Sequence, residues 1–226
     1  MQKTELPMAS EGYPFILFSG FATLIFGVLG FPIPTLLCLL LTGFVTYFFR
    51  DPSRVLPDEP RAIVCPADGK VIVVREVDDD RFLQQRVMKI SIFMNVFNVH
   101  VNRIPFAGTV ERVVLSPGKF YAADKDKAVL NNEFCAVTVT TPGNQRYTMV
   151  QIAGLIARRI VCRAEKGDQV VAGQRFGLIR FGSRVDLYLP LSTRITVCEG
   201  QKVTAGETVL GILEQTGPTA TEESFA

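Results

Sequence analysis

The residue pair Gly182-Ser183 has the composition of a site at which a chain can cleave itself. A serine hydroxyl becomes a nucleophile when a base removes its proton, and glycine has no Cβ to block approach to its own carbonyl. Attack of Ser183 on the Gly182 carbonyl would convert the peptide into an ester. Elimination across Ser183 would then free a chain that begins with dehydroalanine, and hydrolysis of that residue leaves a pyruvoyl group. The alternative is an ordinary turn before a strand at 185–189.

The chain contains a single histidine, His100, so any imidazole chemistry depends on it. Histidine is the side chain whose unperturbed pKa lies near neutrality. His100 is therefore the first candidate for the base that activates Ser183 and for an acid that later returns a proton. A histidine that works as a base usually needs a partner to fix its tautomer, and a carboxylate does this well. The alternative is a structural histidine that is hydrogen-bonded at the end of a strand.

An apolar segment precedes these residues. Residues 14–49 contain no charged side chain, which places them in lipid, and the segment is too long for the roughly 15-residue apolar region of a signal peptide. Gly30, Pro32 and Pro34 divide it into halves of about 17 residues, near the lower limit for a spanning helix. We therefore predict a helical hairpin. A single tilted helix, which the prolines disfavour, and a re-entrant pair are the alternatives.

Three arginines, Arg50, Arg54 and Arg61, follow the apolar segment directly. The positive-inside tendency predicts that the remaining domain lies on the cytoplasmic side of the cell membrane. The same arginines are candidates for binding anionic phospholipid headgroups.

Beyond residue 54 the sequence is typical of strands, with short runs of Val, Ile and Thr separated by Gly, Pro, Asn and Asp. Residues 124–132 are the best candidate for a short helix or an ordered loop. The segment 167–173 recurs 33 residues later as 200–206, in the pattern G-x-x-V-x-x-G. This pattern resembles the turns of biotinyl and lipoyl carrier domains. We predict a mainly β fold, in which a barrel-sandwich-hybrid-like domain follows an N-terminal hydrophobic helical hairpin.

Composition argues against several other functions. A formal net charge of +2 gives no reason to expect a nucleic-acid partner, because the aromatic residues are not interleaved with Lys and Arg. The five cysteines are widely spaced and include no CxxC pair, so neither a disulfide framework nor a metal site is expected. They are Cys38, Cys65, Cys135, Cys162 and Cys198. They are typical of buried core residues in a reducing compartment.

Four features occur together in a fixed order: the apolar hairpin and the segments 66–69, 98–105 and 181–190. In this the chain resembles the phosphatidylserine decarboxylases, in the short membrane-associated form of that family. The resemblance implies that Asp68, in Pro-Ala-Asp-Gly, completes an Asp-His-Ser triad for self-processing. By itself, Asp-Gly between two apolar runs is also an ordinary hairpin turn.

The sequence departs from the long bacterial form of the family at Arg103, where that form has a second histidine. Two interpretations stay open. His100 alone serves both processing and turnover, or Arg103 binds the phosphate or carboxylate of the substrate bidentately.

The resemblance implies an N-terminal tail (1–13), a membrane-associated hairpin (14–49) and a catalytic domain (50–226). Cleavage after residue 182 would give a β subunit (1–182) and an α subunit (183–226) that remain packed as a heterodimer. The implied activity converts phosphatidylserine in the membrane to phosphatidylethanolamine and CO₂, through a Schiff base on the pyruvoyl cofactor made from Ser183.

Two other functions compete with this interpretation. Archaeal relatives of the family act on archaetidylserine, and nothing in the sequence distinguishes acyl from isoprenoid chains. A non-enzymatic alternative is a membrane-anchored adaptor module of the biotinyl or lipoyl type, which would keep its chain intact.

Overall fold

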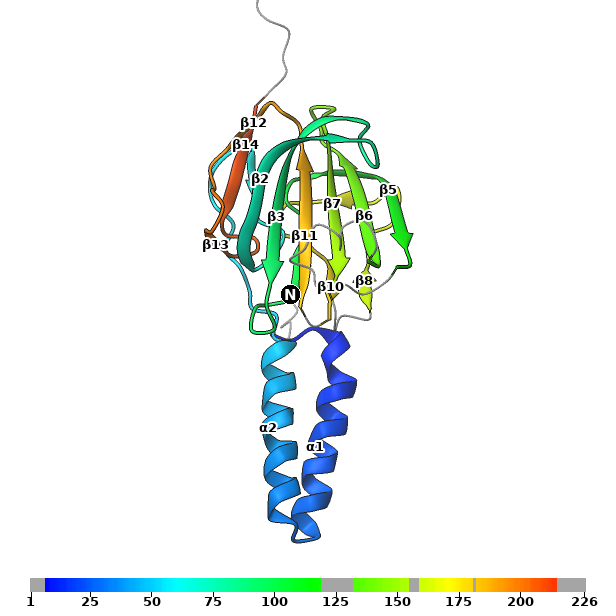
Figure 1. Ribbon diagram of the computed structural model, residues 1–226, viewed down its shortest axis with the longest axis vertical. Coiled ribbons are helices and arrows are strands. Elements are labelled where there is room, and N and C mark those ends of the chain that lie inside the picture. The colour runs from blue at the N-terminus through cyan, green and yellow to red at the C-terminus, as the bar shows by residue number, and fades with distance from the viewer. Residues whose placement is uncertain (1–6, 119–131, 155–158, 181, 215–226) are drawn as a thin grey trace, which may run out of the picture.

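A computed structural model describes residues 7–118, 132–154, 159–180 and 182–214. It consists of a helical hairpin that projects from one end of a β domain (Figure 1). The hairpin comprises a short 3-10 helix η1 (Ser10–Gly12), α1 (Tyr13–Val28) and α2 (Pro32–Phe48). Gly30 adopts a φ of 75° in the turn, a conformation that favours glycine, and prolines occupy the first turns of both helices. The predicted hairpin is confirmed.

The outer surface of the hairpin is apolar. Leu17, Phe18 and Leu40 are each more than 60% exposed, and the helix from Ser10 to Val28 is long and apolar enough to cross a membrane. α2 is apolar but shorter. Because water-exposed apolar surface of this extent is unfavourable, the hairpin is suited to association with a membrane.

A small apolar cluster joins the hairpin to the β domain. It combines residues from the base of the hairpin with side chains of the β domain: Ala9, Val45, Phe48, Phe49, Val99, Val101 and Leu178. The N-terminal segment adds backbone hydrogen bonds, since Ala9 N–H donates to the Phe49 carbonyl. The base of the hairpin is therefore packed onto the domain.

The described strands follow the hairpin in the order β1 (Ala62–Val64), β2 (Gly69–Asp79), β3 (Gln85–Met94), β4 (Val101–Arg103), β5 (Gly108–Ser116), β6 (Phe134–Thr140), β7 (Arg146–Ala153), β8 (Ile160–Cys162), β9 (Gln169–Val170), β10 (Arg175–Ile179), β11 (Ser183–Leu189), β12 (Thr193–Ile195), β13 (Lys202–Val203) and β14 (Val209–Leu213). The fold is mainly β, as predicted. The segment 124–132 lies outside the described residues except for Asn132 at its end.

The described strands form one large and two small antiparallel sheets (Figure 1). The large sheet has the order β13-β2-β3-β11-β7-β6-β5-β9, and the small sheets have the orders β1-β14-β12 and β4-β10-β8. The main core includes Val185, Leu187 and Leu189 from β11. On its other face β11 carries a buried ion cluster, in which Lys89 Nζ lies 3.0 Å from the Asp186 carboxylate. β11 is thus a central strand with both faces buried.

The sequence repeat forms the two edges of the large sheet. Its first copy supplies β9, which pairs with β5, and its second supplies β13, which pairs with β2. All four glycines that bound the two copies have positive φ angles: Gly167, Gly173, Gly200 and Gly206. The repeated pattern therefore encodes two equivalent turns, each ending the sheet with a short strand.

Candidate active site

Ser183 is the first residue of β11, where its backbone pairs with Met94 of β3 and Ala153 of β7. The side chain is fully buried, and its Oγ has no hydrogen-bond partner among the described residues. A buried hydroxyl without a partner carries a free-energy cost, and such groups call for an explanation. Rigid strand pairing therefore holds an unengaged hydroxyl at a fixed position.

Gly182 precedes this serine with a φ of 63°, in the left-handed region that L side chains rarely adopt. A Cβ at this position would meet no atom within 4 Å, so the backbone angle and not the available space favours glycine. The Gly182 N–H donates to Nε2 of His100 over 3.3 Å. The structure thus brings three predicted site residues together: Gly182, Ser183 and His100.

His100 is fully buried, and its Nδ1 lies 2.9 Å from the Asn98 carbonyl. A carbonyl only accepts hydrogen bonds, so Nδ1 carries the proton and Nε2 presents a lone pair towards the cleavage pair. Burial lowers the pKa of His100 to about 4, the Asn98 hydrogen bond opposes this shift, and the charge of Arg50 adds to it. The imidazole is consequently neutral at pH 7, in the form that accepts a proton.

The ring of Phe48, at the end of α2, lies 4.4 Å from the imidazole ring of His100, centroid to centroid. Phe48 is itself fully buried. The helical hairpin therefore supplies part of the apolar cover that shields this histidine from water. The sequence shows no signal for this contact, because the two residues lie far apart along the chain.

Asp68 does not contact His100, contrary to the expectation of a direct triad. One carboxylate oxygen is 2.9 Å from Arg54 Nη2, and the other accepts the Ala205 N–H over 2.8 Å. The turn at 204–208 folds against the segment before β2 and takes up the carboxylate, while the Asn98 carbonyl fixes the histidine tautomer. Sheet register nevertheless places Asp68 at the same end of the sheet as Ser183, two strands away.

Arg103 is engaged in internal contacts. Its guanidinium donates to Asp51 Oδ1, to the Pro52 carbonyl and to the Gly173 carbonyl, over 3.2, 3.0 and 2.9 Å. The side chain is about 8% exposed. These bonds tie the segment after α2 to the turn before β10, so the guanidinium has few donors left for a substrate.

A buried amide pair, which no sequence motif indicates, lies on the Ser183 face of the sheet. Gln151, two residues before Ala153 on β7, donates from Nε2 to Asn102 Oδ1 over 2.8 Å, and both side chains are fully buried. The Gln151 Oε1 has no partner among the described residues. The only sequence signal for this amide pair is the presence of polar residues in otherwise apolar strands. Whether such residues are buried depends on the sheet register, which the sequence does not show.

Comparison with known proteins gives the family. The family model described as phosphatidylserine decarboxylase matches residues 41–211. A phosphatidylserine decarboxylase proenzyme of Desulfotalea psychrophila is 52% identical over 211 residues, which cover 93% of this chain and 99% of that protein. Proenzymes with the same name from Syntrophotalea carbinolica and Geobacter sulfurreducens are 50% and 47% identical over 214 and 218 residues. Those matches cover 95% and 94% of this chain and 100% of each relative.

The chain therefore belongs to the phosphatidylserine decarboxylase family. Membership makes it a decarboxylase of phospholipid biosynthesis whose relatives are named as proenzymes. The non-enzymatic adaptor receives no support from these relatives.

Proposed function

We propose that this protein cleaves itself between Gly182 and Ser183 and then decarboxylates phosphatidylserine at the membrane. One observation supports the proposal above the others. The unpartnered Ser183 hydroxyl is buried next to a glycine whose N–H is bonded to the basic nitrogen of a neutral histidine. A nucleophile, a base and a neighbouring carbonyl are the components that intramolecular acyl transfer requires.

In the proposed cleavage, His100 Nε2 exchanges its hydrogen bond from the Gly182 N–H for one from the Ser183 hydroxyl, and then takes the hydroxyl proton. The oxygen bonds to the Gly182 carbonyl carbon, the peptide C–N bond breaks, and the freed nitrogen of Ser183 takes up a proton. Loss of the Ser183 Cα proton then expels the Gly182 carboxylate. Water converts the resulting dehydroalanine to a pyruvoyl group with release of ammonia.

The two fragments would remain together after this cleavage. The 183–226 fragment supplies β11, which lies between β3 and β7, and β14, which pairs with β1. It also supplies β13, which pairs with β2 at the edge of the sheet. Separating the fragments would break these ladders and expose the core side chains of β11, so the product is a stable heterodimer.

The pyruvoyl group would act as the electron sink for the departing carboxylate. The buried Ser183 position fits it, because the group replaces a hydroxyl that no described residue engages. In our proposal His100 returns a proton to the substrate α-carbon after loss of CO₂. The names of the relatives make phosphatidylserine the first substrate to test, and the arginines after α2 favour a cytoplasmic location for the domain.

For Asp68 we propose a positioning role. Its ion pair with Arg54 and its bond to Ala205 hold the segment that leads into β2, next to the end of β3. The carboxylate would thereby support Ser183 through the sheet without touching the histidine.

Substitution of Ser183 tests the proposed function. The Ser183→Ala protein should remain a single chain and release no CO₂ from phosphatidylserine in vesicles. Ser116→Ala, at the half-buried end of another strand, is the matched control and should be cleaved and active. An active, uncleaved Ser183→Ala protein would remove the basis of the proposal.

A further inference from the structure

A cavity of about 450 Å³ is lined by residues of β5, β6 and β8 and by residues next to the ends of β8 and β10. Two cationic side chains, Arg159 and Arg180, line it. The rest of its lining is apolar or sulfur-containing: Val113, Leu115, Cys135, Ile160, Val161, Cys162 and Ala164. The lining contains no carboxylate among the described residues. The cavity is therefore cationic at one point and apolar around it.

The two arginines face each other across a strand pair. Ile179 pairs with Ile160, and the Arg180 N–H donates to the Arg159 carbonyl in the next position. Like charges directly opposite each other on neighbouring strands destabilise a sheet. Neither arginine forms an ion pair with any described residue, and the Arg180 Nε is buried without a hydrogen-bond partner among them. An anion between the two guanidinium groups would relieve both costs.

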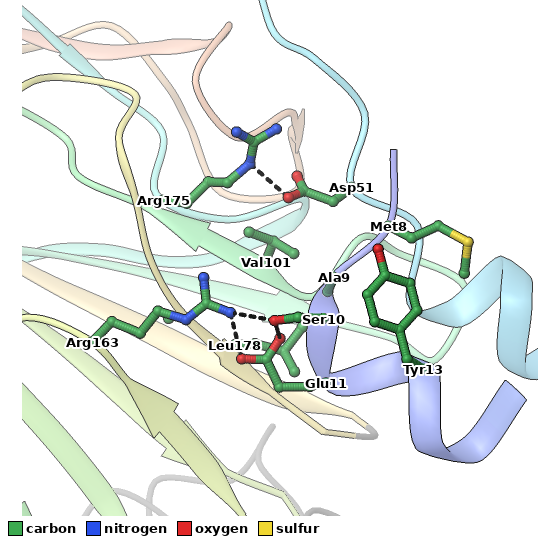
Figure 2. Close-up of a pocket in the computed structure, with 11 residues that line it drawn as sticks. Met8, Ala9, Ser10, Glu11, Tyr13, Asp51, Val101, Arg163, Arg175 and Leu178 are labelled. Atoms are coloured by element: carbon green, nitrogen blue, oxygen red, sulfur yellow. Dashed lines mark hydrogen bonds and ion pairs between the residues drawn. The ribbon is translucent and has the colours of Figure 1, made fainter. Parts of the chain in front are cut away.

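A second cavity at the base of the domain shows the contrasting arrangement (Figure 2). Its volume is about 240 Å³, and it also contains two arginines. There Arg163 lies 2.6 Å from Glu11, and Arg175 lies 2.6 Å from Asp51. These cations are neutralised within the protein, which distinguishes them from Arg159 and Arg180.

The position of the cavity points to a lipid as the source of the anion. The Arg180 guanidinium lies 5.2 Å from the ring centroid of Phe15, in the first turn of α1, so it stands where the apolar hairpin begins. Headgroup phosphates lie at this level of a bilayer. Arg180 also lies two residues before Gly182 in the chain, and the preceding Ile179 N–H donates to the His100 carbonyl.

We propose that Arg159 and Arg180 bind the phosphodiester of a membrane phospholipid and so direct its headgroup to residue 183. The arginine fork matches phosphate oxygens bidentately. In phosphatidylserine an oxygen and two carbons separate the phosphorus from the amine. A phosphodiester bound by the two arginines therefore keeps the amine close to them. The inference rests on the proposed function for the identity of the reaction, but the phosphate site itself is independent of cleavage.

The kinetic test uses Arg180→Gln, Arg159→Gln and Arg180→Lys in the full chain. Each variant should be cleaved normally, as judged by intact mass. Each glutamine substitution should raise the KM about tenfold, because it removes hydrogen bonds to a charged group. The KM is expressed as the mole fraction of phosphatidylserine in phosphatidylcholine vesicles. The kcat should change little, and Arg180→Lys should fall between Gln and the parent protein. Arg163→Gln is the control, because this arginine is already paired, and its KM should not change.

A binding test separates this inference from the proposed function. In the Ser183→Ala background, dihexanoyl phosphatidylserine and dihexanoyl phosphatidylcholine are titrated while phosphorus NMR line widths are recorded. Both lipids should bind, and Arg180→Gln should weaken both about tenfold. Unchanged binding of both lipids to Arg180→Gln would overturn the phosphate site, even if the parent protein decarboxylates phosphatidylserine. Arginine-dependent binding in this background, together with a parent protein that keeps Ser183 and still does not cleave itself, would keep the site and remove the proposed function. Arginine-dependent binding of inorganic phosphate with no binding of either lipid would overturn the lipid assignment.

Discussion

The apolar cover over His100 makes a quantitative prediction for the pH dependence of self-cleavage. Only the neutral imidazole accepts the Ser183 proton, so cleavage should be present above the pKa of His100 and lost as the pH falls through it. Burial lowers that pKa from 6.5 to about 4. At pH 5.5 a histidine with a pKa of 4 is about 97% neutral, whereas one with a pKa of 6.5 is about 9% neutral.

Phe48 is the perturbation to use, because its ring lies on His100 and contacts no substrate position assigned above. Phe48→Ala should admit water to the imidazole and move its pKa back towards 6.5. Full rehydration would slow cleavage about tenfold at pH 5.5 and leave it almost unchanged at pH 8. Phe48→Leu keeps an apolar cover and should follow the parent profile.

Cell-free synthesis of the proenzyme, followed by a chase at fixed pH, gives the cleavage rate directly. The parent profile should rise with a midpoint near 4 and stay level between pH 6 and 8. A midpoint near 6.5 for the parent protein would contradict a His100 whose pKa is lowered by burial. Identical profiles for Phe48→Ala and the parent would show that the hairpin does not control the state of His100.

Four further substitutions, the last with a matched control, test separate features of the site and the fold. Gly182→Ala forces a left-handed φ on an L residue, at a cost of about 1–2 kcal/mol, and should slow cleavage about tenfold in the same chase. His100→Gln removes the base, so the proenzyme should accumulate at every pH; normal cleavage would restrict His100 to turnover. Asp68→Asn should slow cleavage without moving its pH midpoint, because the carboxylate acts through Arg54, and a displaced midpoint would restore the direct triad. Gly69→Ala places a Cβ 2.2 Å from the Phe93 carbonyl oxygen and should lower the Tm by several degrees, whereas Gly143→Ala, with no atom closer than 3.9 Å, should not.

Local patterns in the sequence predicted the architecture. The uncharged segment 14–49 with its central prolines predicted the hairpin, and the runs of β-branched residues predicted the strands. The G-x-x-V-x-x-G repeat indicated two equivalent turns, since glycines with positive φ angles are needed at the same places in both. The pairing of these turns with opposite edges of one sheet is a long-range property that the pattern does not contain.

The site was only partly predictable for the same reason. The resemblance grouped Gly182, Ser183 and His100 as site residues, and in the structure the Gly182 N–H donates to His100 Nε2. The partners of Asp68 and Arg103 depend on how segments distant in sequence fold over them, as the Arg103 contact with Asp51 shows. Local sequence does not determine such ion pairs, because several acidic residues were available to each arginine.

The intact mass of the purified protein under denaturing conditions tests the central claim most directly. We predict two chains, with cleavage after Gly182 and a smaller chain whose first residue has lost its amine and carries a pyruvoyl group. Under native conditions the two should elute together, held by the ladders of β11. A single uncleaved chain of 25.0 kDa, in which Ser183 is unmodified, would contradict self-cleavage.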